Sequence, residues 1–321
     1  MTASTHTALA PSGEQHEIGH GRQRAVVTEI GATLRVYTVD GSPVIDGFGE
    51  RDMCSAGRGQ VLAPWPNRLG DGKYSIDGRH GEAALDEPER GCAIHGLVRW
   101  LPWRLVSRAQ NVLVLGCTLN PQPGYPWRIE LCIEYRLGRA GLVVSTEVTN
   151  ADQHPAPFGI GFHPYVTVGT PVIDFARFQV PGRRRLVTDA RGLPTGETIV
   201  TGTEYDFTEP RMIGTTHLDT AFTDLVRGAD GMARVEIDDP TCHVGATVWM
   251  DERFRYVMVY TADDVDPGSR RRRALAIEPM TCPPDALRSG VDLVRLEPEA
   301  KLHCSWGITP RTLPGTGGPG S

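Results

Sequence analysis

Short stretches in which apolar and polar residues alternate recur along most of this chain of 321 residues. The clearest is Trp127–Leu137, in which Ile129, Leu131, Ile133 and Tyr135 share one face and mostly charged residues share the other. Alternation at every second residue is typical of a β-strand with one buried face. Glycine or proline interrupts every candidate for a long amphipathic helix, so a helical fold is excluded.

Further strands are predicted by the same alternation or by runs of β-branched residues. They are Ala25–Ile30, Leu34–Val39, Asn111–Leu119, Gly141–Asn150, Arg234–Ile237, Val244–Met250, Tyr256–Thr261, Ala274–Ile277 and His303–Ile308. The 37 glycines and 25 prolines follow no period and favour many turns between short strands. We therefore expect an all-β fold, a large antiparallel sandwich with few short helices.

The ends of the chain and its overall composition limit its organisation and its partners. We expect residues 1–13 and 313–321 to be disordered and residues 14–312 to form a single domain. The net charge of −6 disfavours nucleic acid as a partner. No apolar run approaches the roughly 18 residues of a membrane span, and the N-terminus lacks the pattern of a secretory signal. The 7 scattered cysteines contain no CxxC pair, so we expect a cytoplasmic protein with free thiols and no metal site.

Five short motifs place polar residues in apolar or strand-like surroundings, where an unpaired polar group is costly. They are Leu62–Leu69 with Asn67 and Arg68, Ala93–Leu97 with His95, Phe158–Tyr165 with His163, Leu218–Phe222 with Asp219, and Ala276–Met280 with Glu278. Each has an ordinary structural explanation, such as a satisfied core histidine, a capping aspartate or a glutamate paired with an arginine. Together they predict a polar cleft that fits proton transfer on a polyhydroxylated ligand.

Two of these residues have the local setting of an acid–base pair. Glycines on either side of Ile160 permit close approach of a ligand, and the proline after His163 restrains that histidine. Glu278 is expected to end its strand, because Pro279 follows it and cannot donate to a ladder. Burial of this carboxyl would raise its pKa, which suits a general base near neutral pH.

In their chain order, the motifs APWPNRL, AIHGL, GFHPY, LDTAF and IEPM resemble those of the aldose 1-epimerases, or galactose mutarotases. The resemblance implies a large antiparallel β-supersandwich and an isomerase of sugar metabolism that interconverts α and β anomers without a cofactor. It implies Glu278 as the base on the C1 hydroxyl and His163 as the acid on the ring oxygen. It further implies that His95, Asn67, Arg68 and Asp219 bind the sugar. The two catalytic side chains are then expected about 5–8 Å apart, spanning the O5–C1–O1 unit.

The sequence also departs from the better-known galactose-active members, which indicates a divergent bacterial branch. Leu97 follows Gly96 where those members carry a second glycine, and Thr220 follows Asp219 where they often carry histidine. The sugar is therefore left open between neutral, phosphorylated and sulfonated aldoses. Arginines at Arg183–Arg185 or Arg270–Arg273 could serve an anionic group, although a solvated loop is the ordinary explanation.

A sugar-binding module of the same fold is the alternative from another class, and the presence of both Glu278 and His163 argues against it. We expect a small-molecule sugar as the partner, and a monomer or homodimer.

Overall fold

A computed structural model describes residues 10–265 and 270–312 of the chain. Disorder was expected for residues 1–13 and 313–321; residues 1–9 and 313–321 lie outside the described ranges. The expectation was wrong for residues 10–13. Ser12 is buried, and its carbonyl accepts a hydrogen bond from the Ile30 amide at 3.0 Å. A hydrogen-bonded turn holds these residues, and such a turn leaves no apolar pattern in the sequence.

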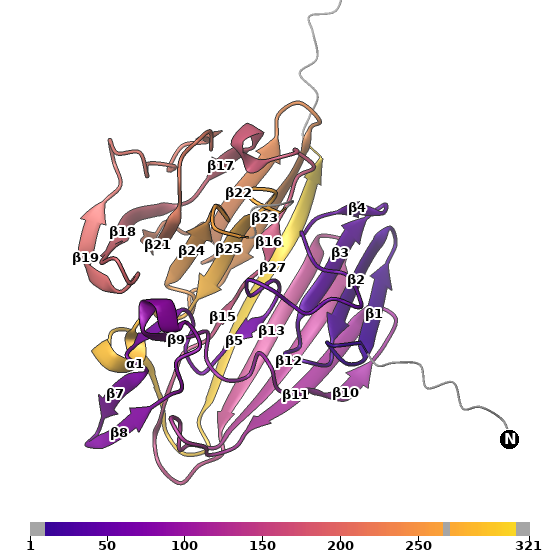
Figure 1. Cartoon of the computed structure of the whole chain (residues 1–321). Coiled ribbons are helices and arrows are strands. Elements are labelled where there is room, and N and C mark those ends of the chain that lie inside the picture. Colours follow the sequence, from indigo (N-terminus) through magenta and orange to yellow (C-terminus); the bar gives the residue numbers. More distant parts are fainter. Residues whose placement is uncertain (1–9, 266–269, 313–321) are drawn as a thin grey trace, which may run out of the picture.

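The largest sheet has 9 strands, and each neighbouring pair in it is antiparallel. In spatial order its strands are β10 (Arg104–Arg108), β11 (Val112–Leu119), β12 (Ile129–Gly138), β13 (Gly141–Asn150), β27 (Lys301–Thr312), β23 (Val244–Met250), β22 (Ala233–Asp239), β17 (Arg177–Gln179) and β20 (Arg211–Met212). Figure 1 shows the long strand β27 in yellow near the middle of this sheet. The alternation predicted for β12 is confirmed, because Ile129, Leu131, Ile133 and Tyr135 are all buried.

A second sheet of 8 strands carries much of the functional region. Its order is β19 (Pro194–Ile199), β18 (Gly182–Thr188), β21 (Asp219–Leu225), β24 (Tyr256–Tyr260), β25 (Leu275–Met280), β15 (Gly161–Phe162) and β5 (Val61–Leu62), and β16 (Tyr165–Val166) also pairs with β25. All of these pairings are antiparallel.

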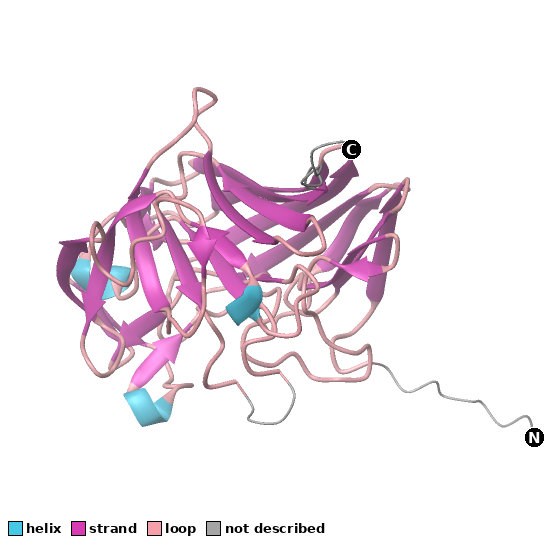
Figure 2. Cartoon of the chain, turned by 90° about the horizontal axis from the view of Figure 1, so that it is seen from above, coloured by secondary structure: helices cyan, strands magenta, loops and turns pink. Residues whose placement is uncertain are grey.

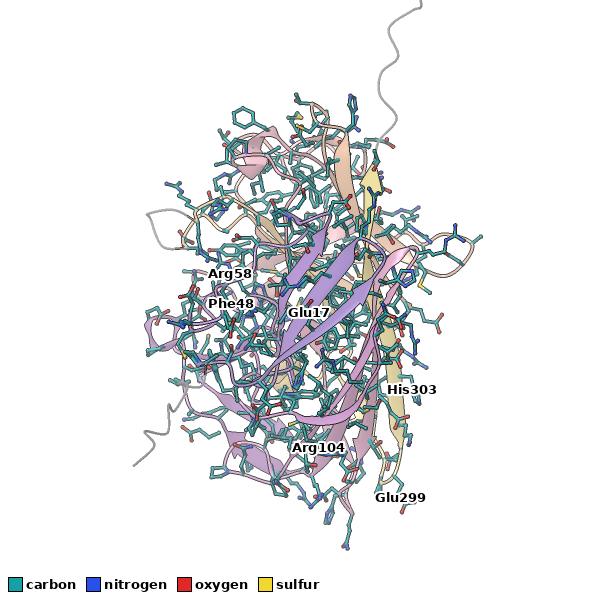
Figure 3. The ribbon with its side chains drawn as sticks, turned by 90° about the vertical axis from the view of Figure 1, so that its right-hand side faces the viewer. Glu17, Phe48, Arg58, Arg104, Glu299 and His303 are labelled. Atoms are coloured by element: carbon teal, nitrogen blue, oxygen red, sulfur yellow. The ribbon has the colours of Figure 1, made fainter. Side chains whose placement is uncertain are left out.

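Smaller elements complete the chain. A sheet of 4 strands contains β1 (Gln15–His20), β2 (Gln23–Thr28), β3 (Leu34–Val39) and β4 (Ser42–Pro43); three two-stranded pairs are β6 (Arg68–Gly70) with β9 (Cys92–Ile94), β7 (Lys73–Ile76) with β8 (Arg79–Glu82), and β14 (Ala156–Phe158) with β26 (Val294–Leu296). Figure 3 shows the first of these sheets from the front, with Glu17 on β1.

The helices are few and short, as expected. They are η1 (Pro88–Arg90), η2 (Ile173–Phe175) and α1 (Ala286–Ser289), and Figure 2 shows how little helix stands among the strands. The longest helix in the described ranges has 4 residues, far too few to cross a membrane.

The core lies between the two large sheets. Phe162 on β15 meets Trp306 on β27 with ring centroids 5.2 Å apart, and one cluster of buried apolar residues contains side chains of both sheets. This packing of antiparallel sheets is the all-β sandwich expected from the sequence.

Strand β25 does not stop at Glu278, and this expectation was wrong. The strand continues to Met280, with Pro279 paired opposite Val257 of β24. The amides of Ile277 and Thr281 donate to Pro164 and Ile160 on the opposite edge. The same register places Pro279 opposite Phe162 at the end of β15, so one ladder bond is left out there because proline has no N–H. His163 is the next residue and lies opposite Glu278.

Candidate active site

His163 and Glu278 come together because they lie on neighbouring strands of one sheet. His163 directly follows β15, and Glu278 is in β25. The Nε2 atom of His163 is 3.2 Å from Oε1 of Glu278, and the residues are only 5% and 2% exposed. We expected a separation of about 5–8 Å, which was wrong. Side chains on the same face of adjacent strands start about 5 Å apart at Cβ, so these two reach each other directly.

Burial sets the protonation of this pair. It lowers the pKa of His163, with Arg58 and Arg99 adding to the effect, and raises the pKa of Glu278 well above its ordinary value, with Asp219 adding to the effect. Each shift favours the neutral form, because a buried charge is costly. Both shifts therefore favour a neutral pair, in which the protonated carboxyl of Glu278 faces an unprotonated Nε2 and the imidazole of His163 keeps its own proton on Nδ1.

The described part of the protein leaves the remaining polar atoms of the pair without a partner. Nδ1 of His163 and Oε2 of Glu278 are buried and have no hydrogen-bond partner within the described part of the chain. A buried polar atom without a partner costs roughly 1–3 kcal/mol. These two atoms therefore favour a polar ligand or water at this position.

His95 stands beside His163. The two rings meet edge to face, with centroids 5.3 Å apart. Nδ1 of His95 accepts a hydrogen bond from the backbone N–H of Asn67 at 3.3 Å. Burial holds the pKa of His95 well below its ordinary value. A neutral ring that accepts at Nδ1 carries its proton on Nε2, so His95 can donate from Nε2.

The short β6–β9 pair positions Asn67, Arg68 and His95. Arg68 pairs with Ile94, and the His95 amide donates to the Asn67 carbonyl at 2.9 Å. Asn67, just before β6, and His95, just after β9, have φ values of 57° and 65°, so both adopt the left-handed conformation. This geometry turns both side chains towards the same cavity.

Arg68 is held by a residue that sequence analysis missed. Nε and Nη2 of Arg68 donate to the two carboxylate oxygens of Glu87 at 2.7 and 2.9 Å. The third nitrogen, Nη1, lies 4.0 Å from Oδ2 of Asp219, at the start of β21. Glu87 lies just before η1 in a polar segment without any strand pattern, so no sequence signal marks it.

A cavity of about 630 Å³ joins these groups. All six site residues predicted from the sequence line it: Asn67, Arg68, His95, His163, Asp219 and Glu278. The volume lies within the range of small-molecule sites. Residues missed from sequence also line it, among them Glu87, Arg99, Tyr165 and Tyr260.

Tyr165 stacks on the ring of His163 and supports it. Its ring lies 5.1 Å from the ring of His163 at an interplanar angle of 16°, and the guanidinium of Arg58 lies 4.5 Å from the centroid of Tyr165. Tyr165 could have been identified from the sequence, because it lies two residues after His163 in the same motif. Arg58 comes from the segment between β4 and β5; Figure 3 labels it together with Phe48 of the same segment.

The arginines of the two arginine-rich segments do not line this cavity. Arg272 is buried and bridges Asp174 and Asp263, with closest contacts of 2.7 and 2.9 Å, so the solvated-loop explanation is wrong for this residue. Its guanidinium fastens the loop after β24 to the segment at η2. Arg183–Arg185 line no part of this cavity, although Arg185 reaches a neighbouring one.

Comparisons with known proteins agree with this fold. Residues 14–305 match the family model described as aldose 1-epimerase. The chain is 30% identical over 292 residues to "Uncharacterized protein YihR" of Escherichia coli, covering 91% of both chains. It is 28% identical over 298 residues to "Maltose epimerase" of Levilactobacillus brevis, covering 82% of this chain and 84% of the relative.

Solved structures show the same fold at low sequence identity. A GalM/aldose epimerase homologue from C. elegans superposes with a TM-score of 0.83 at 18% identity, covering 94% of this chain and 99% of the other. A structure described as a putative aldose 1-epimerase from Escherichia coli K12 gives a TM-score of 0.80 at 19% identity, with coverage of 94% and 99%.

Proposed function

The chain belongs to the aldose 1-epimerase family, and from this premise we propose that it interconverts the α and β anomers of an aldose by opening and reclosing the sugar ring. The observation that carries the proposal is the contact of 3.2 Å between His163 and Glu278 on one cavity. A module that only binds sugar has no need for a buried pair that shares a proton.

The reaction begins with the carboxyl proton of Glu278. Transfer of this proton from Glu278 to Nε2 of His163 leaves a carboxylate beside an imidazolium. The carboxylate takes the proton of the C1 hydroxyl while the imidazolium protonates the ring oxygen. The bond from C1 to the ring oxygen breaks, and C1 becomes a carbonyl carbon. Rotation about C1–C2 and the reverse transfers close the other anomer and restore the pair.

The other residues of the cavity would hold the sugar in place. His95 can donate from Nε2 towards the ring oxygen, where it would stabilise developing charge. Asn67, Arg68 and Asp219 would bind hydroxyl groups. Glu87 would act as a positioning residue, because its fork fixes the direction of the Arg68 guanidinium.

The charges around the cavity favour a neutral sugar over an anionic one. Each arginine in its wall already faces a carboxylate: Arg68 and Arg90 face Glu87, and Arg99 faces Asp86. Further acids, including Asp219 and Asp264, also line the wall. A phosphorylated or sulfonated aldose would bring more negative charge to a wall that already carries more acids than arginines. The relative named maltose epimerase supports a sugar epimerase in general terms.

The test is anomer exchange measured by NMR with freshly dissolved pure anomers of neutral, phosphorylated and sulfonated aldoses. We expect acceleration above the spontaneous rate for at least one neutral aldose. A protein that binds these sugars but accelerates none of them would be a binding module. Acceleration confined to charged sugars would support the hexose-6-phosphate or sulfosugar alternative.

A further inference from the structure

A second cavity of about 430 Å³ adjoins the catalytic one. The two cavities share Arg90, Asp219 and Asp264 as wall residues. The second cavity lies where β18 and β21 separate, because their pairing extends only from Gly182 to Arg185 on β18. A ligand that extends past Asp219 would therefore enter it.

Hydrogen bonds fasten the loop that forms one wall of this second cavity. Oδ1 of Asp189 accepts bonds from the amides of Arg191 and Leu193, both at 2.9 Å. The side chain of Arg191 donates to the carbonyl of Arg90 at 2.8 Å and to Asp71 at 2.8 Å. These hydrogen bonds fix the loop in place against the neighbouring segments.

The same loop touches the sugar-binding arginine of the first cavity. Gly192 has a φ of 78°, and a Cβ added there would lie 2.6 Å from Nη1 of Arg68. Nη1 is also the nitrogen that lies 4.0 Å from Asp219. Arg68 and Asp219 thus form the boundary between the two cavities, and a ligand held by them is positioned to extend into both.

Arg185 brings its guanidinium to the wall of the second cavity. The guanidinium carbon lies 3.8 Å from the centroid of the Tyr205 ring, Nη1 donates to the Leu186 carbonyl at 3.3 Å, and the buried Nε has no hydrogen-bond partner within the described residues. Across residues 10–265 and 270–312, no carboxylate lies within ion-pair distance of Arg185. The stacking on Tyr205 fixes the plane of the guanidinium, so its donors are already oriented.

The chemistry of the wall selects a neutral, hydroxyl-rich group. The wall contains two arginines, Arg90 and Arg185, and three carboxylates, Asp189, Asp219 and Asp264. This balance disfavours an anion. Hydroxyl and imidazole groups from Thr188, Tyr205, His217 and Thr220 complete the wall. Such a mixture of donors, acceptors and an aromatic ring suits a sugar.

We propose that the second cavity is a subsite for the second sugar unit of a reducing disaccharide, whose reducing unit occupies the catalytic cavity. Arg185 is the specificity-determining residue of this subsite and binds hydroxyl groups of the second unit. This inference rests on the proposed anomer exchange, since it names the size of the substrate for that same site.

The test compares maltose, cellobiose and lactose with glucose and galactose for wild type, Arg185→Ala and a control. The control is Arg184→Ala, because Arg184 precedes Arg185 on β18, pairs with Glu197 and lines neither cavity. We expect wild type to favour at least one disaccharide in kcat/KM. Arg185→Ala should lower that value roughly tenfold, as for loss of one hydrogen bond to a charged group, and leave the monosaccharide value unchanged. Arg184→Ala should change neither value.

Three results would overturn the subsite. One is anomer exchange on monosaccharides alone, another is an equal effect of Arg185→Ala on both classes, and the third is the same selective loss in Arg184→Ala. If Arg185→Ala does not fold, Arg185→Gln takes its place. If wild type accelerates no sugar, the proposed function fails, and calorimetric binding of maltose and glucose decides the subsite separately. Tighter binding of maltose that depends on Arg185 then supports it, and equal binding overturns it.

Discussion

At the scale of single residues, Glu278 is unusual for a carboxyl. It is almost fully buried, and among the described residues its ion-pair contact is with His163, at 3.2 Å, rather than with an arginine. Arg68, which would lower the pKa of Glu278, is committed to Glu87. Burial therefore favours the protonated carboxyl, and in the proposed mechanism Glu278 becomes a base when it passes its proton to His163.

Glu278→Gln should remove the base and leave the fold intact. The amide keeps the size and a donor but cannot accept the proton of the C1 hydroxyl. We expect catalysed anomer exchange to fall by roughly 10²–10⁴, the usual contribution of a positioned general base. The measurement is NMR exchange with the best aldose. Glu252→Gln, at an exposed acid, is the control and should keep the wild-type rate. A folded Glu278→Gln protein with the wild-type rate would assign the base elsewhere.

The same carboxyl should make stability depend on pH. The pKa of Glu278 is raised in the folded state above the value of 4.5 that it has when unfolded. Unfolding therefore releases a proton in the window between those two pKa values, and stability falls as pH rises through it, by up to about 1.4 kcal/mol per pH unit. Below pH 4.5 this contribution is fully present.

Urea unfolding of wild type and Glu278→Gln from pH 4 to pH 9 measures this contribution. The difference in unfolding free energy, wild type minus variant, should decrease as pH rises. A difference independent of pH would contradict the raised pKa. His163 contributes in the opposite direction, because its pKa is lowered from 6.5; it costs stability as pH falls below 6.5. Both variants keep His163, so its effect largely cancels in the comparison.

At the scale of elements, the site is built where strands stop or are interrupted. β15 and β16 leave a gap of two residues, and His163 stands in that gap opposite Glu278. A glycine in the segment between β4 and β5 packs against the ring of His163. Gly57 has a φ of 71°, and a Cβ added there would lie 2.8 Å from Cδ2 of His163.

Gly57→Ala should therefore damage the catalytic histidine, and the chain offers a matched control. Gly41 has a φ of 76° but nothing within 4 Å of an added Cβ. Both alanine variants should lose roughly 1–2 kcal/mol of stability from the left-handed backbone. Only Gly57→Ala should displace His163 and lower the exchange rate, by about tenfold or more. The measurements are thermal unfolding and NMR exchange, and equal rates in the two variants would show that Gly57 does not position His163.

At the scale of the whole molecule, the packing of the two large sheets supports the site. Phe162 precedes His163 and packs between the sheets against Trp306 and Phe254. Successive residues of an extended chain point to opposite faces of a sheet. Phe162 therefore enters the core while His163, the next residue, enters the cavity, and this couples the inter-sheet contact to the position of the histidine.

Phe162→Leu should test this coupling against Phe178→Leu. Phe178, on β17, is similarly buried and packs against Phe207, and neither of these two residues lines the cavity. Each variant should lose roughly 1–3 kcal/mol of stability through the smaller side chain and the space left behind. Phe162→Leu should also lower the exchange rate at temperatures where it is fully folded, whereas Phe178→Leu should not. Equal rates in the two folded variants would argue against the coupling.

The sequence by itself determined the class of the fold and six of the residues that line the cavity. Alternation in β12 and β13 is a local property with a period of two, so it can be read without knowing any partner strand. The motifs with His95, His163 and Glu278 stand out for a similar reason, since each is a polar residue in a local apolar setting.

Only the tertiary structure decided how those residues meet. The Arg68–Glu87 fork, the contact of 3.2 Å between His163 and Glu278, and the burial of Arg272 between Asp174 and Asp263 each join segments separated along the chain. Such contacts depend on which strands pair and in what register, and a shift of one residue would turn every side chain to the other face. Local pattern carries no information on that choice, because it is made by the packing of the whole sandwich.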